Sequence, residues 1–248
     1  MLNERTFLFN LKIVFSMPKI TAVIQTCTGN FSKSKTFYQK LAFESLSKDE
    51  PTLFTDGKFL LEINPENTAR TGLKLYQTDW QTTVTALSKV TKVVPIEGGY
   101  LVSDPNGVKV YLMDSEMTYD YQIAGESKAI PGNFAGLSIE AVDVEKTVQF
   151  WEIIGYKKTM GSLEQGWIAF ENGTSIGVSI MKPMVCPHLF FTPGLTFFNG
   201  GKNLPIIEKI KAANIPIAEE ITVFNKEGVV DNVIICDPGG LGFFIFND

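Results

Sequence analysis

The side chains of this chain that could do chemistry are few and widely separated. His188 is the single histidine among 248 residues, and the three cysteines, Cys27, Cys186 and Cys236, form no Cys-x-x-Cys pair. Zinc sites and disulfide frameworks need such groups in spaced sets, and a catalytic cysteine needs a base. The sequence therefore argues against a zinc site, a disulfide-stabilised fold and a Cys–His nucleophile at Cys27.

Two other local features have simpler explanations than catalysis. His188 lies in the proline-containing stretch 181–193 and is followed by Leu189-Phe190-Phe191, so we expect it to pack on aromatic rings. Gly239-Gly240 lacks the lysine and helix that follow a phosphate-binding loop, and a strand-like run comes after it.

Composition limits the classes of protein that fit. Hydrophobic residues make up 44% of the chain and aromatic residues 12%, enough for two packed cores. The net charge of −5 argues against nucleic acid as a partner. No apolar run approaches the roughly 20 residues of a membrane span, and the unpaired cysteines predict a cytoplasmic protein. The apolar start is interrupted by Asn10 and Lys12, so residues 1–17 are expected to form an extension.

The chain repeats two patterns, and this repeat predicts its architecture. Asn30 to Phe43 and Asp143 to Tyr156 share a helix-like pattern with Phe37-Tyr38 in one copy and Phe150-Trp151 in the other. Each half closes on an Asp-Pro turn before an apolar strand, Asp104-Pro-Asn-Gly in the first and Asp237-Pro-Gly-Gly in the second. The repeat therefore predicts two related domains, at 18–115 and 133–248, joined by a polar linker at 116–132.

Within each half the pattern is strand, helix, then three strands, given twice. Expected strands lie at 20–26, 52–55, 58–64, 72–76, 92–96, 99–102, 108–112, 136–140, 166–170, 175–180 and 194–198, with further strands to the C-terminus. Asn30, Asp79 and Asp143 are the expected N-caps of three helices, and a fourth helix is expected over 204–213.

These motifs, in this order and duplicated, resemble the vicinal-oxygen-chelate superfamily. It includes glyoxalase I, extradiol catechol dioxygenases, fosfomycin-resistance enzymes and bleomycin-resistance proteins. The resemblance covers roughly 18–114 and 133–248. It implies an α+β fold in which four βαβββ modules pair into two glyoxalase-like domains, each a curved mixed sheet around a cup.

The resemblance also implies where metal ligands would lie, and this chain departs from the pattern there. The corresponding positions hold Val23, Glu62, Gly72 and Tyr111 in the first half and Gly136, Gly177, Gly194 and Phe244 in the second. Only Glu62 can bind a metal, and shifting the alignment by one residue yields no His or carboxylate set. No metal site and no cofactor are therefore predicted, with a divalent metal at Glu62 as the alternative.

Strand alternation on this fold defines two candidate ligand-binding sets. The first cup is predicted to contain Gln25, Cys27, Glu62, Lys74, Tyr76, Lys109 and Tyr111. The second is predicted to contain Ser138, Glu140, Ser179, Thr196, Phe198 and Phe244, with a filled core as the simpler explanation. Glu62 is the single candidate for a catalytic role, as a general base or lone ligand.

Three functions are compatible with this pattern. The first is a metal-independent binder of a small organic molecule, similar in principle to bleomycin-resistance proteins. The second is a lyase or dioxygenase of the same superfamily with a non-standard site around Glu62. The third is a non-catalytic interaction protein with a partner-facing apolar patch. The protein is expected to be a monomer or homodimer.

Overall fold

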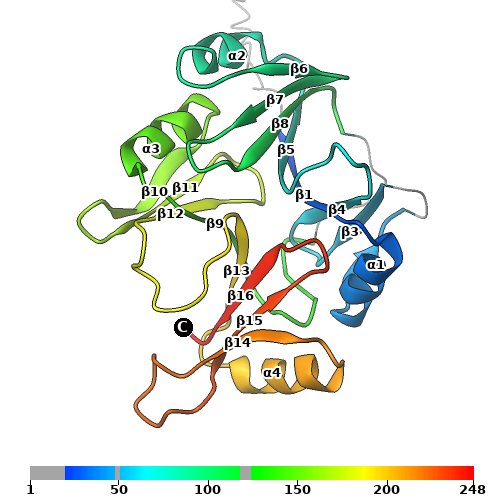
Figure 1. The fold of residues 1–248 in the computed structure, drawn as a ribbon, viewed down its shortest axis with the longest axis vertical. Helices are drawn as coiled ribbons and strands as arrows, with labels where there is room; N and C mark the ends of the chain where they lie inside the picture. The colour runs from blue at the N-terminus through cyan, green and yellow to red at the C-terminus, as the bar shows by residue number, and fades with distance from the viewer. Residues whose placement is uncertain (1–19, 48–50, 118–123) are drawn as a thin grey trace, which may run out of the picture.

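The computed structural model describes residues 20–47, 51–117 and 124–248. The expected N-terminal extension, 1–17, and part of the expected linker, 118–123, lie outside these residues. Figure 1 shows the chain running through two groups of strands, with the helices at their outer sides. Within the described ranges, no helix is long and apolar enough to cross a membrane.

Each half contains eight strands and two helices. The first half consists of β1 (Thr21–Cys27), α1 (Phe31–Lys40), β2 (Glu44–Ser45), β3 (Thr52–Thr55), β4 (Leu60–Asn64), β5 (Gly72–Gln77), α2 (Gln81–Leu87), β6 (Val94–Ile96), β7 (Gly99–Ser103) and β8 (Lys109–Asp114). The second half consists of β9 (Phe134–Glu140), α3 (Val144–Ile153), β10 (Lys157–Ser162), β11 (Trp167–Glu171), β12 (Val178–Met181), β13 (Gly194–Phe198), α4 (Asn203–Ala212), β14 (Ile217–Ile221), β15 (Asn232–Cys236) and β16 (Gly242–Phe246).

Strand order confirms the predicted fold class. The first sheet runs β2-β3-β4-β1-β5-β8-β7-β6 and the second β10-β11-β12-β9-β13-β16-β15-β14. In each, the opening strand of a module is parallel to that module's last strand and antiparallel to the opening strand of the next module. Two βαβββ modules thus join at their opening strands, at β1–β5 and at β9–β13.

Local capping chemistry explains where the helices begin. Asn30 and Asp143 accept hydrogen bonds from the backbone N–H of Lys33 and Lys146, which confirms both predicted N-caps. The expected cap at Asp79 is wrong. Its carboxylate accepts from the Gln81 N–H at 2.7 Å, but the N-cap position of α2 is Trp80, without a side-chain cap.

Two strands were absent from the sequence-based expectation, and one expected strand begins later than predicted. The short edge strand β2 and the polar edge strand β10 were not predicted, since their sequences lack an apolar alternation. The expected strand at 175–180 begins only at Val178, because Thr174 is held in a turn by hydrogen bonds to Asn172 Oδ1.

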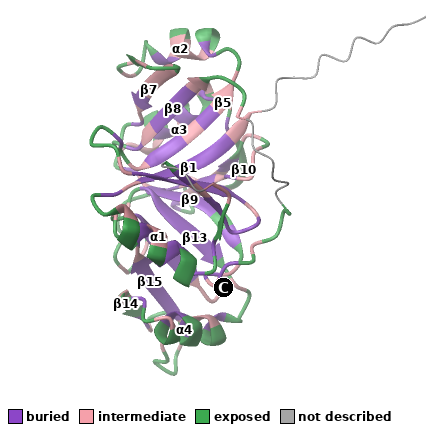
Figure 2. Cartoon of the chain, turned by 90° about the vertical axis from the view of Figure 1, so that its right-hand side faces the viewer, coloured by how far each residue is buried: buried purple, intermediate pink, exposed green. Residues whose placement is uncertain are grey.

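The two halves share their main core. A single cluster of buried apolar side chains extends through both sheets. Contacts between aromatic rings connect the two halves within this cluster. Phe59 stacks on Phe134 at a centroid distance of 3.9 Å, and the ring centroids of Phe243 and Phe37 of α1 are 5.7 Å apart. Figure 2 shows the buried strands forming one continuous column, with α2 and α4 at its ends and α1 and α3 between them.

The repeated motifs meet each other across this junction. In the second half's Asp-Pro turn, Asp237 accepts hydrogen bonds from Tyr38 of α1 at 2.9 Å and from Thr26 of β1 at 2.7 Å. In the first half's turn, Asn106 donates to Thr147 of α3 at 3.0 Å. Each turn therefore holds the first helix of the other half, and the two contacts are related by the internal repeat.

Both turn aspartates are buried, and burial raises the pKa of each carboxyl. For Asp237, hydrogen bonds from Thr26, Tyr38 and the Leu241 and Gly239 N–H groups counteract this shift. For Asp104, the backbone N–H groups of Asn106 and Val108 and the side-chain amide of Asn106 do so. The Asp237 carboxyl group is thus satisfied both by its own turn and by the other half, whereas the Asp104 carboxyl group accepts its hydrogen bonds from its own turn.

We predict that Gly239→Ala destabilises the protein by about 1–3 kcal/mol. A Cβ at Gly239 would lie 2.0 Å from the Cys27 carbonyl oxygen, so the turn could not approach β1 as closely. Urea unfolding measures the effect. Gly29→Ala is the matched control, since a Cβ there meets nothing within 4 Å, and equal stability of the two variants would contradict the prediction.

Tyr38→Phe is expected to reduce the free energy of unfolding by about 1–2 kcal/mol, because Asp237 loses a buried hydrogen-bond donor. Tyr100→Phe removes the same hydroxyl from a half-buried ring of β7 and is expected to cost less than about 0.5 kcal/mol. A Tyr38→Phe variant as stable as Tyr100→Phe in the same denaturation assay would refute the role of this contact.

Candidate functional site

Strand register places the polar residues of the first sheet on one face. Gln25 is opposite Glu62 on β4 and Gly72 on β5. Lys74 is opposite Val23 on β1 and Tyr111 on β8. Cross-strand partners share a face, so these side chains lie together, while the alternate residues Ala22, Ile24, Leu61, Leu73 and Val110 belong to the core. We call this face of the first sheet the first cup.

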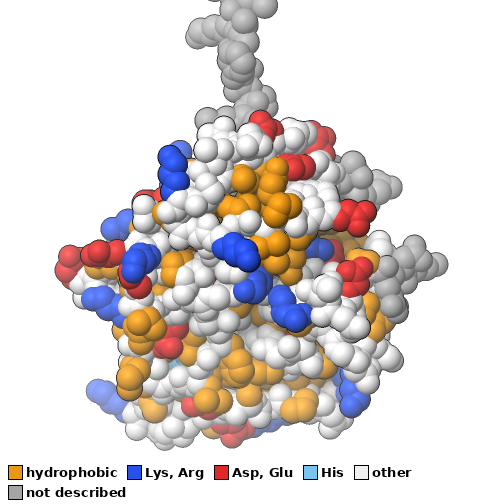
Figure 3. Space-filling view, turned by 45° about the horizontal axis from the view of Figure 1, so that its top comes forward, with side chains coloured by type: hydrophobic (Ala, Val, Ile, Leu, Met, Phe, Trp, Pro, Cys, Tyr) orange, Lys and Arg blue, Asp and Glu red, His pale blue; other side chains and the backbone are white. Residues whose placement is uncertain are grey.

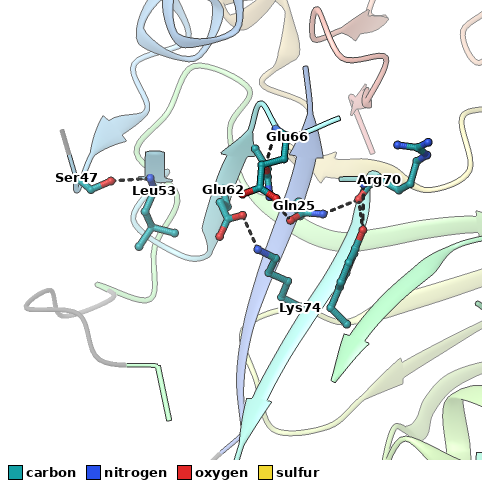
Figure 4. A network of polar contacts seen from close by, with 9 residues as sticks. Gln25, Ser47, Leu53, Glu62, Glu66, Arg70 and Lys74 are labelled. Carbon is teal, nitrogen blue, oxygen red and sulfur yellow. Dashed lines mark hydrogen bonds and ion pairs between the residues drawn. The ribbon is translucent and has the colours of Figure 1, made fainter. Parts of the chain in front are cut away.

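An ion pair occupies the centre of the first cup. The Lys74 Nζ lies 2.5 Å from Glu62 Oε1, and their side chains are only 12% and 9% exposed. Figure 4 shows the two side chains reaching toward each other from β5 and β4 across β1. The Lys74 ammonium also lies 5.9 Å from the centre of the Tyr111 ring, within range of a cation–π contact.

Gln25 and Tyr111 are hydrogen-bonded within the protein. Gln25 donates to the Arg70 carbonyl at 2.7 Å and accepts from Asn64 Nδ2 at 3.1 Å. The Tyr111 hydroxyl accepts from the Arg70 N–H at 3.0 Å and donates to the Arg70 carbonyl at 3.2 Å. Both side chains thus anchor the segment before β5, and Glu62 and Lys74 form the ion pair between them.

The remaining predicted residues of the first cup flank this pair. Cys27 contacts Thr71 Oγ1 at 3.4 Å, and Lys109 donates to Ser103 Oγ at 2.8 Å. Tyr76 lies on the same face by register, and burial, followed by the negative charge of Glu62, raises the pKa of its phenol. The structure therefore brings all seven predicted residues onto one face, with Glu62 and Lys74 in contact.

The second sheet has four positions equivalent to the central ones of the first. Ser138 is opposite Ser179 and Gly194, as Gln25 is opposite Glu62 and Gly72. Thr196 is opposite Phe244, as Lys74 is opposite Tyr111. Ser138, Ser179, Thr196 and Phe244 thus replace the charged and amide side chains with hydroxyls and a ring, and Ser138 Oγ lies 2.5 Å from Thr196 Oγ1.

The second cup is occupied by its own chain. Phe190 and Phe191, from the connection between β12 and β13, pack on Phe244 at centroid distances of 4.9 and 6.4 Å. A Cβ at Gly242 would lie 2.6 Å from the Phe191 ring. This filling was not predicted for that connection, although its Phe-Phe pair is the signal from which it could have been found.

Other predicted residues of the second cup lie at its rim. Glu140 accepts from the Met184 N–H at 2.8 Å, and Phe198 is 42% exposed and stacks on Phe246. His188 lies 5.3 Å from the Phe246 ring and 5.7 Å from the Phe244 ring, which confirms that it packs on aromatic side chains.

The donor atoms of neither cup form a metal site. Among the described residues, no group of three or more His, Cys, Asp or Glu side chains could hold an ion. Of the eight positions implied by the resemblance, Val23 and the four glycines offer no side-chain donor atom. Glu62, the one carboxylate, is paired with Lys74.

A cavity also lies outside both cups. Its volume is about 380 Å³, and it is lined by Lys89, Val90, Thr91, Pro105, Lys146, Gln149 and Phe150, between the end of α2 and α3. Lys146 in this lining is paired with Asp143 at 2.7 Å, on an exposed surface. Figure 3 shows Lys and Arg side chains gathered at the middle of one face of the molecule beside hydrophobic ones.

Comparison with solved structures identifies proteins of the same fold. An extradiol ring-cleaving dioxygenase from B. fuscum has a TM-score of 0.58 at 15% identity, over 93% of this chain and 72% of that one. Homoprotocatechuate 2,3-dioxygenase from Arthrobacter globiformis has a TM-score of 0.59 at 14% identity, over 90% and 78%. The Mn(II)-bound glyoxalase from Novosphingobium aromaticivorans has a TM-score of 0.55 at 12% identity, over 92% and 82%.

No protein-family model and no curated protein matches the sequence. At 10–15% identity these neighbours establish the fold and leave the activity open. The paired βαβββ modules and the strand order of both sheets describe this fold, which the chain has in common with these dioxygenases and this glyoxalase.

Proposed function

We propose that the protein binds a small organic molecule in the first cup without a metal ion. The observation that carries this proposal is the Glu62–Lys74 ion pair, which is sheltered on the sheet face opposite the core. Ligand sites commonly place a small number of polar groups beside apolar side chains. The side chains of Leu53 and Leu101 lie on the same face, opposite Glu62 and Tyr111.

Only the first cup is proposed as a ligand site. In the second, the equivalent positions carry no charge and Phe191 occupies the space above Gly242. Aromatic side chains packed in this way contribute to stability as a core does. The residues predicted there are therefore assigned to packing, and ligand binding is proposed for the first cup alone.

A lyase or dioxygenase with a metal at Glu62 is the alternative. The structural neighbours include a glyoxalase described as Mn(II)-bound, so the fold implies a metal. The residues of this chain do not fit one. A cation at Glu62 would lie beside the Lys74 ammonium, and the neighbouring Gln25 and Tyr111 are already engaged with Arg70 and Asn64.

The first test is a thermal-shift screen of the full chain against a library of metabolites and antibiotics. A ligand at 100 times its Kd stabilises the folded state by about 2.7 kcal/mol, which raises the Tm by about 5–10 °C. The double variant Glu62→Leu/Lys74→Met should lose the shift. The matched control Lys211→Met/Glu220→Leu, which removes an exposed ion pair, should keep it. A screen without any stabilising compound would contradict the proposal.

Elemental analysis by plasma mass spectrometry tests the metal alternative. We expect well below one equivalent of Mn, Fe, Ni or Zn in protein purified without a tag or chelator, because a single paired carboxylate is a poor divalent-metal site. About one equivalent that disappears in Glu62→Gln would instead support the lyase or dioxygenase, and the metal-independent proposal would be abandoned.

A further inference from the structure

The hydrogen-bonding capacity left in the first cup defines what the ligand must offer. An ammonium has three N–H donors, and within the part of the chain that the structure describes, Lys74 donates to Glu62 Oε1 alone. A carboxylate accepts several hydrogen bonds, so Glu62 also retains acceptor capacity at Oε2. Gln25 and Tyr111 are each held by two hydrogen bonds, Gln25 to Asn64 and Arg70 and Tyr111 to Arg70, whereas the ion pair offers a charged donor and a charged acceptor side by side.

The charge of the pair selects against ions. Glu62 and Lys74 are in contact and together neutral, and both are largely withdrawn from water. An anionic ligand at Lys74 would also approach the Glu62 carboxylate, and a cationic ligand at Glu62 would approach the ammonium. In a sheltered site either repulsion adds to the cost of desolvating the ligand. A neutral ligand avoids both costs.

We infer, resting on the proposed function, that the ligand is a neutral molecule with a hydrogen-bond acceptor and an N–H donor side by side, as along the edge of a cyclic amide. Its carbonyl oxygen accepts from Lys74 Nζ, and its N–H donates to the Glu62 carboxylate. Its apolar body lies against Leu53 and Leu101, the half-buried neighbours of Glu62 and Tyr111 on this face. The ion pair thus acts as a two-point recognition element.

Three bicyclic probes of similar size test this inference. The probe 2-quinolone carries the amide edge, N-methyl-2-quinolone lacks the donor, and 2-naphthoate is an anion. Their Kd values are measured by NMR titration of the full chain. We expect 2-quinolone to bind at least tenfold more tightly than either of the others, since a lost partner leaves a sheltered polar group unpaired.

The variants locate the discrimination at the ion pair. In Glu62→Leu/Lys74→Met the preference should fall to about onefold, whereas Lys211→Met/Glu220→Leu should retain it. Glu62→Gln, which preserves side-chain size, should reduce the preference several-fold. This single variant replaces the double variant in the test if the double variant does not unfold cooperatively. Retention of the full preference in the Glu62 variants would overturn the inference.

The remaining outcomes separate the inference from the proposed function. Tighter binding of 2-naphthoate that depends on Lys74 would overturn the neutral-ligand inference and leave a ligand site in the first cup. Equal binding of all three probes would also overturn it. If a library compound stabilises the chain but none of the probes binds, the inference of an amide edge is contradicted and the proposed ligand site stands. If no probe and no library compound binds, both the neutral-ligand inference and the proposed ligand site in the first cup are contradicted.

Discussion

The burial of two turn aspartates at the junction between the halves is the constraint on which the rest of the structure depends. A buried carboxyl group must be hydrogen-bonded, and Asp237 finds its partners partly in its own turn and partly in Tyr38 and Thr26 of the other half. Asp104 is placed in the same way beside α3, with Asn106 bonded to Thr147. The two halves are thereby joined by their own repeated motifs, and the buried faces of α1 and α3 pack on one continuous core.

This arrangement leaves the opposite face of each sheet free to diverge. Because the core packs against one face of each sheet, the choice of side chain on the other face is limited mainly by the space that the curved sheet leaves there. In the first cup they carry an ion pair and an amide, and in the second they carry hydroxyls and a phenylalanine covered by Phe190 and Phe191. The face of the first sheet thus carries charged and amide side chains, whereas that of the second is covered by aromatic ones.

The physical chemistry of the Glu62–Lys74 pair favours recognition over stability as its role. A largely buried ion pair costs desolvation free energy that its attraction only partly offsets, and apolar replacements of such pairs are often neutral or stabilising. The pair is also not needed to connect the halves, because its partners all lie within the first sheet. The ammonium beside the carboxylate places a donor and an acceptor in contact in this cup, with no net charge from the pair.

The sequence by itself determined the duplication, the module order, the caps at Asn30 and Asp143 and the absence of a histidine set, because these depend on local spacing and on residue identity. Period-two alternation also placed Glu62, Lys74 and Tyr111 on one face. Only the tertiary structure decided that Lys74 reaches Glu62 across β1, that Phe191 fills the second cup and that the two halves share a core. These features join residues distant in sequence, and pairing at such distances depends on strand order and on how a connecting loop folds back, neither of which local pattern specifies.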